Sequence, residues 1–239
     1  PADATSAPDA AKLICAGVNY ASHMAEMGAA PPGPDWKAWF FLKPPSTTVV
    51  GPGDAVRIDP DPAEQVDWEG ELGIVIGRGG RDIAAADAGA HVAGFTVVND
   101  VSARGPHRRD GAPHDAFRFD WLASKAQDTF CPMGPAVTPS WVLPDPDERR
   151  LRLWVGDELL QDERVGNMIV GWRRLVEAAS SRVTLEPGDV IAAGTPAGVG
   201  VPRGRFLRPG EVVRVEIEGI GTLTNPVVSR RPAAVAGTV

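Results

Sequence analysis

The sequence has few cysteines and no disulfide framework. Only Cys15 and Cys131 occur among its 239 residues, and both lie within apolar stretches. Two buried thiols are typical of a reducing compartment, so we expect a cytoplasmic location. Neither cysteine has a base close to it in the sequence, which argues against a catalytic thiolate.

Long apolar runs and basic stripes are also missing. No apolar stretch approaches the roughly 18 residues that a membrane-spanning helix needs. The net charge is −7, from 24 basic and 31 acidic residues, and lysine and arginine form no stripe. We therefore expect neither a membrane nor a nucleic acid as partner.

Nucleotide-binding signatures are absent as well. Strand-like segments do not alternate with helical ones, and no G-x-G-x-x-G follows a strand, which argues against a doubly wound sheet. The glycine-rich stretch 192–200 lacks the Gly-Lys-Ser/Thr ending of a phosphate-binding loop. Its backbone N–H groups could instead approach a carboxylate.

What the sequence does contain is a repeated pattern of turn followed by strand. Pro-Gly turns at 51–54, 186–189 and 208–211 each precede a β-branched run. Apolar residues make up 43% of the chain, which is enough for a sizeable core. We predict a mostly β (α+β) single domain over 13–229 with a few short peripheral helices, between flexible tails at 1–12 and 230–239.

Hydrophobic periodicity gives the individual elements. The predicted strands cover 13–18, 72–76, 94–99, 151–155, 190–191 and 212–217. The predicted helices cover 21–27, the alanine-rich 82–92, and 168–180.

An acidic pair suggests a metal site. Glu69 and Glu71 would share one face of a strand, where two like charges are unfavourable unless a cation lies between them. Asp100 follows an apolar run and needs a partner of its own. Three carboxylates suit a hard divalent cation, Mg²⁺, Mn²⁺ or Ca²⁺. The alternative is that the two glutamates form the solvated face of an edge strand.

His23 and Glu26 are three residues apart, so one helical turn would bring them into contact. A carboxylate that orients an imidazole makes a general base, whereas the alternative is a surface ion pair. Gly28 and the prolines after it suggest a lid. Lys125 and Arg104 could bind an anionic substrate or stabilise an oxyanion, and their alternative role is a surface salt bridge.

Six segments, taken together, resemble the fumarylacetoacetate hydrolase family. They occur in the family's order and extend over roughly residues 13 to 228. The segments are NYASHMAEMG, DWEGELGIVIGR, VAGFTVVNDVSAR, SKAQDTFCPMGP, TLEPGDVIAAGTPAGVG and PGEVVRVEIEGIGTLTN.

The resemblance implies a mixed β-sandwich roll, a homodimer, and a bound Mg²⁺ or Mn²⁺, with Ca²⁺ able to substitute. It implies a small anionic 2-oxo acid or β-dicarbonyl substrate. The implied metal ligands are Glu69, Glu71 and Asp100, and the implied catalytic residues are His23, Glu26 and Lys125. The implied substrate contacts are Arg104 and Thr195, and we expect Tyr20 and His107 to be further substrate contacts.

Two departures from the family pattern concern the chemistry. Where the family has Asp-x-Gln after Ser-Ala-Arg, this chain has Gly105-Pro106-His107, so an imidazole replaces an amide that often positions the attacking water. Where the family has Gly-Lys-Ser, this chain has Ser124-Lys125-Ala126, so a hydroxyl beside the lysine is lost.

Three functions remain open on the sequence. The first, which we expect because it is the activity most often named in the family, is metal-assisted hydrolysis of a C–C bond in an acylpyruvate or related 2,4-dioxo acid, with His23 activating water. The second is decarboxylation of an oxaloacetate-like acid, or hydration or isomerisation of a small 2-oxo acid, at the same metal chelate. The third is a non-catalytic metal-binding β domain, which the intact His23–Glu26 pair argues against.

Overall fold

The computed structural model describes residues 11–30, 32–33 and 35–230. The tails expected at 1–12 and 230–239 therefore lie almost wholly outside the described residues. Two described residues at their borders are held to the body: Lys12 forms an ion pair with Glu186, and Arg230 forms one with Asp59.

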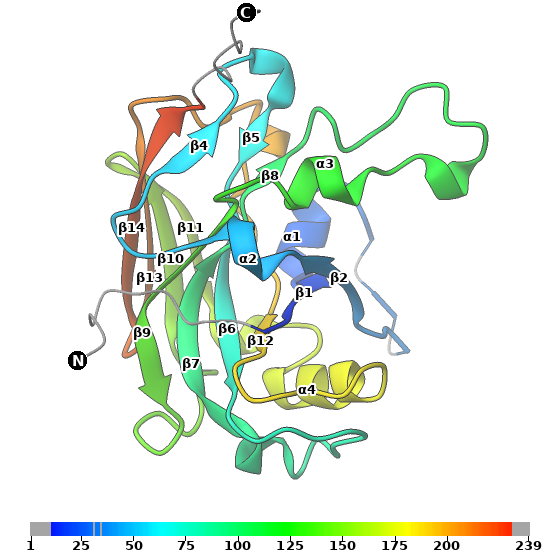
Figure 1. Cartoon of the computed structure of the whole chain (residues 1–239), viewed down its shortest axis with the longest axis vertical. Coiled ribbons are helices and arrows are strands. Elements are labelled where there is room, and N and C mark those ends of the chain that lie inside the picture. Colours follow the sequence, from blue (N-terminus) through cyan, green and yellow to red (C-terminus); the bar gives the residue numbers. More distant parts are fainter. Residues whose placement is uncertain (1–10, 31, 34, 231–239) are drawn as a thin grey trace, which may run out of the picture.

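A seven-stranded mixed sheet forms one layer of the fold (Figure 1). Its strand order is β2-β1-β12-β6-β7-β9-β3, where β1 runs parallel to β12 and β3 parallel to β9, and the other pairs are antiparallel. The strands are β2 (Trp39–Lys43), β1 (Leu13–Gly17), β12 (Val190–Ala192), β6 (Gly70–Ile76), β7 (Val92–Asn99), β9 (Cys131–Pro139) and β3 (Val49–Val50).

A five-stranded sheet forms the second layer, in the order β11-β10-β13-β14-β4. Its strands are β11 (Glu158–Arg164), β10 (Arg150–Val155), β13 (Val212–Ile217), β14 (Gly221–Ser229) and β4 (Val56–Ile58). Buried and solvent-accessible residues alternate along β10 and β13, as expected for strands with one face on the core. Every residue of β6 is buried instead, because both of its faces are covered.

Short elements complete the fold. A two-stranded sheet pairs β5 (Val66–Asp67) with β8 (Ser102–Ala103). The helices are α1 (Ala21–Glu26), α2 (Pro45–Thr48), α3 (Trp121–Lys125) and α4 (Trp172–Ser180). One-turn 3₁₀ helices cover Pro62–Glu64, Ala88–Ala90, Asp115–Phe117, Val165–Asn167 and Val201–Arg203. In Figure 1, α1, α3 and α4 lie on the side of β6 and β7 away from the five-stranded sheet. Among the described residues, no helix is long and apolar enough to cross a membrane.

The expected fold class, mostly β with a few short helices, is confirmed, but the helix expected over 82–92 is wrong. Only Ala88–Ala90 is helical there, as a single 3₁₀ turn. Asp82 has a φ of 52°, outside the helical range, and the Ile83 and Ala85 N–H groups donate to side chains of α4, Ser180 Oγ and Glu177 Oε1. The later N–H groups donate to carbonyls three residues before them, from Asp87 to Ala84 and from His91 to Ala88, so the segment is a series of turns. Tertiary contacts therefore override the helix propensity of alanine.

The helix expected over 168–180 begins later, at Trp172. Asn19 holds the residues before it in an extended conformation, because the Ile169 N–H donates to the Asn19 backbone carbonyl and the Val170 N–H to its Oδ1. The Asn19 side-chain amide in turn donates to the carbonyls of Val170 and Ala193. This asparagine thereby ties the start of α1 to the approach to α4 and to the end of β12.

Candidate active site and metal site

The three predicted metal ligands converge at one end of the β6–β7 pair. Glu69, Glu71 and Asp100 each present a carboxylate oxygen, and these oxygens lie within 4.8 Å of one another. Their exposed fractions are 6%, 1% and 1%, so the alternative of a solvated strand face is wrong.

Strand register brings the three carboxylates together. Gly70 lies opposite Asn99, and the next pair outward is joined by the Asp100 N–H, which donates to the Glu69 carbonyl at 2.8 Å. The Glu69 N–H donates to Asn99 Oδ1 at 3.1 Å. Glu69 precedes β6 rather than lying within it, and this pairing keeps its side chain near that of Glu71.

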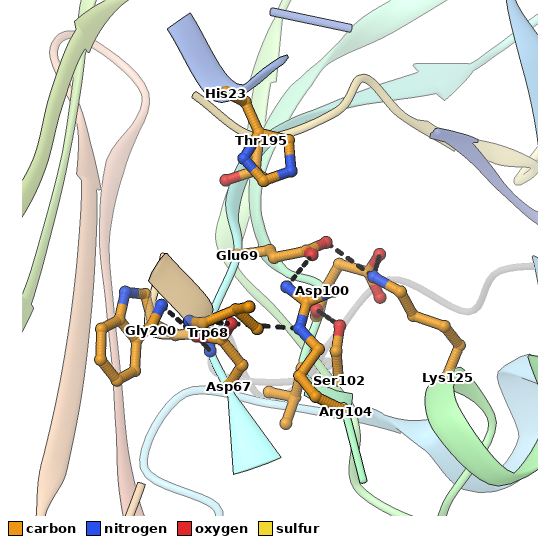
Figure 2. A network of polar contacts seen from close by, with 12 residues as sticks. His23, Asp67, Trp68, Glu69, Asp100, Ser102, Arg104, Lys125, Thr195 and Gly200 are labelled. Atoms are coloured by element: carbon orange, nitrogen blue, oxygen red, sulfur yellow. Dashed lines mark hydrogen bonds and ion pairs between the residues drawn. The ribbon is translucent and has the colours of Figure 1, made fainter. Parts of the chain in front are cut away.

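Two predicted cations lie against this acidic cluster (Figure 2). Lys125 Nζ donates to Glu69 Oε2 and to Asp100 Oδ2, both at 2.6 Å. Arg104 donates to Glu69 Oε1 at 2.5 Å and to Asp67 Oδ2 at 3.1 Å. Lys125 is buried, so the alternative of a surface salt bridge is wrong for it.

A third cation, Lys43, was not predicted from the sequence. It is 1% exposed at the end of β2, where its Nζ forms an ion pair with Asp100 and donates to the carbonyls of Val101 and Phe130, at 3.0 and 2.6 Å. A lysine at the end of the apolar run Trp39-Phe40-Phe41-Leu42 was the available signal. Its partner could not be inferred, because Asp100 follows β7, which is separated from β2 in the sheet by β1, β12 and β6.

The carboxylates of the cluster differ in their electrostatic balance. Burial, together with the negative charges of Asp100 and Glu69, raises the pKa of Glu71 well above its usual value. Burial acts in the same direction on Glu69, but Lys125 and Arg104 outweigh it and lower the pKa of Glu69. Burial raises the pKa of Asp67 despite its contact with Arg104.

This balance tests whether a divalent cation fits. The Glu71 carboxylate accepts a hydrogen bond from the Gly194 N–H at 2.8 Å, and no described cation forms an ion pair with it. A divalent cation among the three carboxylates would supply the missing positive charge. The all-oxygen donor set is one that hard cations prefer. The acidic triad therefore fits a divalent metal ion.

The predicted His23–Glu26 pair is formed. His23 Nδ1 lies 2.7 Å from Glu26 Oε1, and the Gly198 N–H donates to Glu26 Oε2 at 2.7 Å. His23 is 8% exposed, so this is not a fully exposed surface pair. The glycine-rich loop after β12 thus fixes the carboxylate, and the carboxylate fixes the imidazole. Figure 2 shows His23 and Thr195 on the same side of Glu69.

A cavity of about 240 Å³ joins these groups. Its lining includes predicted metal ligands, catalytic residues and substrate contacts: Glu69, Glu71, His23, Lys125, Arg104, Thr195 and His107. Thr195 is held there by its hydroxyl, which donates to the Gly70 carbonyl at 3.0 Å and accepts from Gln161 Nε2 at 2.8 Å. The roles assigned to these residues stay predictions.

Tyr20 is not brought to this cavity. It is 1% exposed, its hydroxyl donates to the Val165 carbonyl at 3.1 Å, and it is not among the described residues that line the cavity. The structure therefore places this predicted substrate contact in the core, at the start of α1.

The sequence also did not identify Asp67 and Gln161. Asp67 is fully buried and accepts hydrogen bonds from the N–H groups of Gly200 and Trp68, at 2.7 and 2.8 Å, besides its contact with Arg104. Gln161 Nε2 donates to Thr195, and its Oε1 accepts from the Gly70 N–H at 2.9 Å. Asp67 begins the acidic segment and could have been noticed, whereas Gln161 lies in a strand with no local signal.

Comparison with known proteins agrees with this geometry. A family model described as fumarylacetoacetate (FAA) hydrolase C-terminal matches residues 12–228. A mitochondrial oxaloacetate tautomerase of Xenopus laevis is 41% identical over 219 residues, which cover 91% of this chain and 65% of the relative. The chain thus spans just under two thirds of that relative's length.

Solved structures give the same fold. The 5-carboxymethyl-2-hydroxymuconate delta-isomerase of Mycobacterium smegmatis matches with a TM-score of 0.80 and 41% identity, covering 95% of this chain and 83% of that one. The maleylpyruvate hydrolase of Sphingobium sp. SYK-6, in complex with manganese(II) and pyruvate, matches with a TM-score of 0.75 and 31% identity, covering 95% and 74%. The chain belongs to the fumarylacetoacetate hydrolase family, and it is an enzyme with that family's fold.

Proposed function

We propose that this enzyme catalyses metal-assisted proton transfer on a small 2-oxo acid, as a keto–enol tautomerase or a double-bond isomerase. The observation that carries the proposal is that one cavity is lined both by Glu69 and Glu71 of an acidic triad suited to a divalent cation and by His23, which Glu26 orients. Relatives named as a tautomerase and as an isomerase support this choice over hydrolysis, which the sequence alone had placed first.

The residues that would hold the metal are Glu69, Glu71 and Asp100. We propose Mg²⁺ or Mn²⁺, with Ca²⁺ able to substitute, because a manganese(II) ion is present in the maleylpyruvate hydrolase relative. When bound, such an ion acts as a Lewis acid that polarises the 2-oxo group and makes the neighbouring C–H more acidic.

The chain's own residues then move the proton. His23 takes the proton from the carbon beside the 2-oxo group, and Glu26 stabilises the imidazolium that results. His23 returns the proton to the 2-oxo oxygen in a tautomerisation, or to a more distant carbon in an isomerisation, so no oxidant or water is consumed. Lys125 and Arg104 lie at the carboxylate cluster, where they can stabilise negative charge that develops on the substrate oxygen.

The test is the ketonisation of enol-oxaloacetate, followed by its ultraviolet absorbance, with Mg²⁺ or with excess chelator. We expect metal-dependent acceleration that His23→Ala lowers by about 100-fold or more. His91→Ala is the matched control, because His91 lies outside the cavity and its ring forms one hydrogen bond among the described residues, to the Arg78 carbonyl. The proposal would be contradicted if the metal-loaded enzyme accelerated neither the tautomerisation nor the isomerisation of any 2-oxo acid.

Hydrolysis of an acylpyruvate is the second candidate. It is favoured by the maleylpyruvate hydrolase relative and by the same His23–Glu26 pair, which could deprotonate a water instead. Release of acetate and pyruvate from acetylpyruvate, in stoichiometric amounts and only with metal, would place this reaction first.

We also propose that the enzyme is a homodimer in the cytoplasm. Sedimentation would test the oligomeric state, and cell fractionation would test the location.

A further inference from the structure

We infer that the substrate carries an uncharged, flat or apolar tail, which packs on a wall of four rings formed by Trp39, Phe41, His107 and Trp121. This inference rests on the proposed function and names the substrate class of the same cavity. All four residues line the cavity that also contains Glu69 and Glu71.

The four rings form one continuous surface. Trp121 of α3 is at its centre: its ring stacks on Phe41 with centroids 5.1 Å apart, meets Trp39 edge-on at 5.3 Å, and meets His107 edge-on at 4.6 Å. Phe119 packs behind His107 at 5.1 Å. The wall thus draws on β2, on α3 and on the segment between β8 and α3, which are brought together only by the fold.

So many aromatic rings around one cavity are unusual for this chain. Phe, Trp and Tyr make up only 6% of the sequence, with seven Trp, seven Phe and one Tyr. Three of these rings nevertheless share a cavity of about 240 Å³. Aromatic faces bind planar and apolar groups in preference to a hydrated carboxylate.

The charges of the cavity point in the same direction. Among the described residues that line it, the lysine and arginine side chains are Lys125 and Arg104, and both already form ion pairs with Glu69. Lys125 Nζ lies 5.2 Å from the centre of the Phe41 ring, so the wall begins where the charged cluster ends. A second substrate carboxylate on the wall would therefore find no uncommitted cation among these residues.

His107 does not supply that cation. Burial, followed by the positive charges of Arg104 and Lys125, lowers its pKa, so the ring stays neutral near pH 7. The remaining boundary of the cavity is apolar as well, because Met24 and Met27 from α1 and its C-terminal end line it. A neutral tail thus meets aromatic rings and thioethers, which adapt well to apolar groups.

The test compares two 2-oxo acids that differ in the tail. Binding of phenylpyruvate and of 2-oxoglutarate to the Mg²⁺-loaded enzyme is measured by titration calorimetry, and the ketonisation rates of enol-phenylpyruvate and enol-oxaloacetate are compared. We expect phenylpyruvate to bind at least about tenfold more tightly than 2-oxoglutarate. We also expect kcat/KM to be higher for enol-phenylpyruvate than for enol-oxaloacetate.

Variants assign the preference to the wall. Trp121→Ala should weaken phenylpyruvate binding by about tenfold and change 2-oxoglutarate binding by less than about twofold. Trp121→Phe keeps a ring and should retain most of the preference, which guards against an effect of misfolding. Trp141→Ala is the matched control, because Trp141 is 81% exposed and does not line the cavity.

The outcomes separate this inference from the proposed function. Equal or tighter binding of 2-oxoglutarate, or a preference that survives Trp121→Ala, overturns the inference while tautomerisation of oxaloacetate can still stand. If the metal-loaded enzyme neither binds nor converts any of the 2-oxo acids, the proposed function fails and the inference fails with it.

Discussion

The outer face of the five-stranded sheet and the buried end of the β6–β7 pair use the same kinds of charged residue in opposite ways. On the outer face, Arg152 is 28% exposed and pairs with Asp162, Glu216 and Glu218 at 3.0 to 3.6 Å. At the buried end, Lys43 and Asp100 pair at 0% and 1% side-chain exposure. Water screens the first group, so its charges serve solubility.

The second group has lost its water, so its ions are stable only as a set. Four buried carboxylates, Asp67, Glu69, Glu71 and Asp100, face three cations, Lys43, Arg104 and Lys125. Removal of a buried charge from water is costly, and apolar residues would usually fill such a space with greater stability. We therefore infer that the buried set is kept for the chemistry of the proposed function.

The largest effect should follow the loss of a buried cation. Lys43→Met removes one of the two lysines that pair with Asp100, leaves the buried carboxylates with one positive charge fewer, and should lower the free energy of unfolding by about 3–5 kcal/mol. Urea unfolding of the metal-free protein measures this change. Lys37→Met is the control on an exposed lysine, and a loss for Lys43→Met no larger than the control's would contradict the contrast.

Metal binding should have the second-largest effect on stability. Mg²⁺ or Mn²⁺ at one hundred times its dissociation constant should stabilise the folded enzyme by about 2.7 kcal/mol, because the folded state alone assembles the three carboxylates. Thermal unfolding with and without the ion, at fixed ionic strength, measures the shift. If the ion stabilises the Asp100→Asn variant as much as the unchanged enzyme, the ion binds elsewhere.

The pH dependence of the metal-free protein should reveal Glu71. Its folded-state pKa is raised above the ordinary 4.5, so the folded state holds a proton that the unfolded state releases. The stability that this proton contributes is present below pH 4.5 and is lost as the pH rises towards the folded-state pKa. Glu71→Gln should remove this decline and should stabilise the metal-free protein above pH 4.5 by about 1–3 kcal/mol, while it abolishes metal binding. If Glu71→Gln leaves the pH profile unchanged, another group already balances the negative charge of the Glu71 carboxylate.

The smallest effect belongs to the outer face. Arg152→Ala should change the free energy of unfolding by no more than about 1 kcal/mol, because its three ion pairs are solvated. The change should shrink further in 1 M salt, where the screening length is about 3 Å. A salt-insensitive loss of several kcal/mol would remove the distinction between the two regions.

Local patterns in the sequence were sufficient for much of the fold and for the core of the site. Alternation and β-branched runs located strands such as β10 and β13, and the carboxylates of Glu69, Glu71 and Asp100 proved to converge. The i,i+3 spacing of His23 and Glu26 was enough to predict their contact. These features depend on neighbours in sequence or on one strand pair.

What could not be predicted depends on distant partners. Lys43 reaches Asp100 from 57 positions away, and Gln161 reaches Thr195 from a strand of the other sheet. The segment 82–92 has helical composition, but its backbone forms a series of turns, and its first N–H groups donate to side chains of α4. The aromatic wall likewise combines residues that are scattered from 39 to 121, and no spacing in the sequence announces it.

The burial of Tyr20 has a practical consequence. It is the only tyrosine in the chain, and burial, followed by the negative charge of Glu71, raises its pKa far above 10.0. In moderately alkaline solution the folded protein should therefore show no phenolate absorbance, whereas the unfolded chain should ionise normally. The phenolate absorbance of Tyr20 then measures the fraction of unfolded protein directly, without a label, a dye or an enzymatic assay.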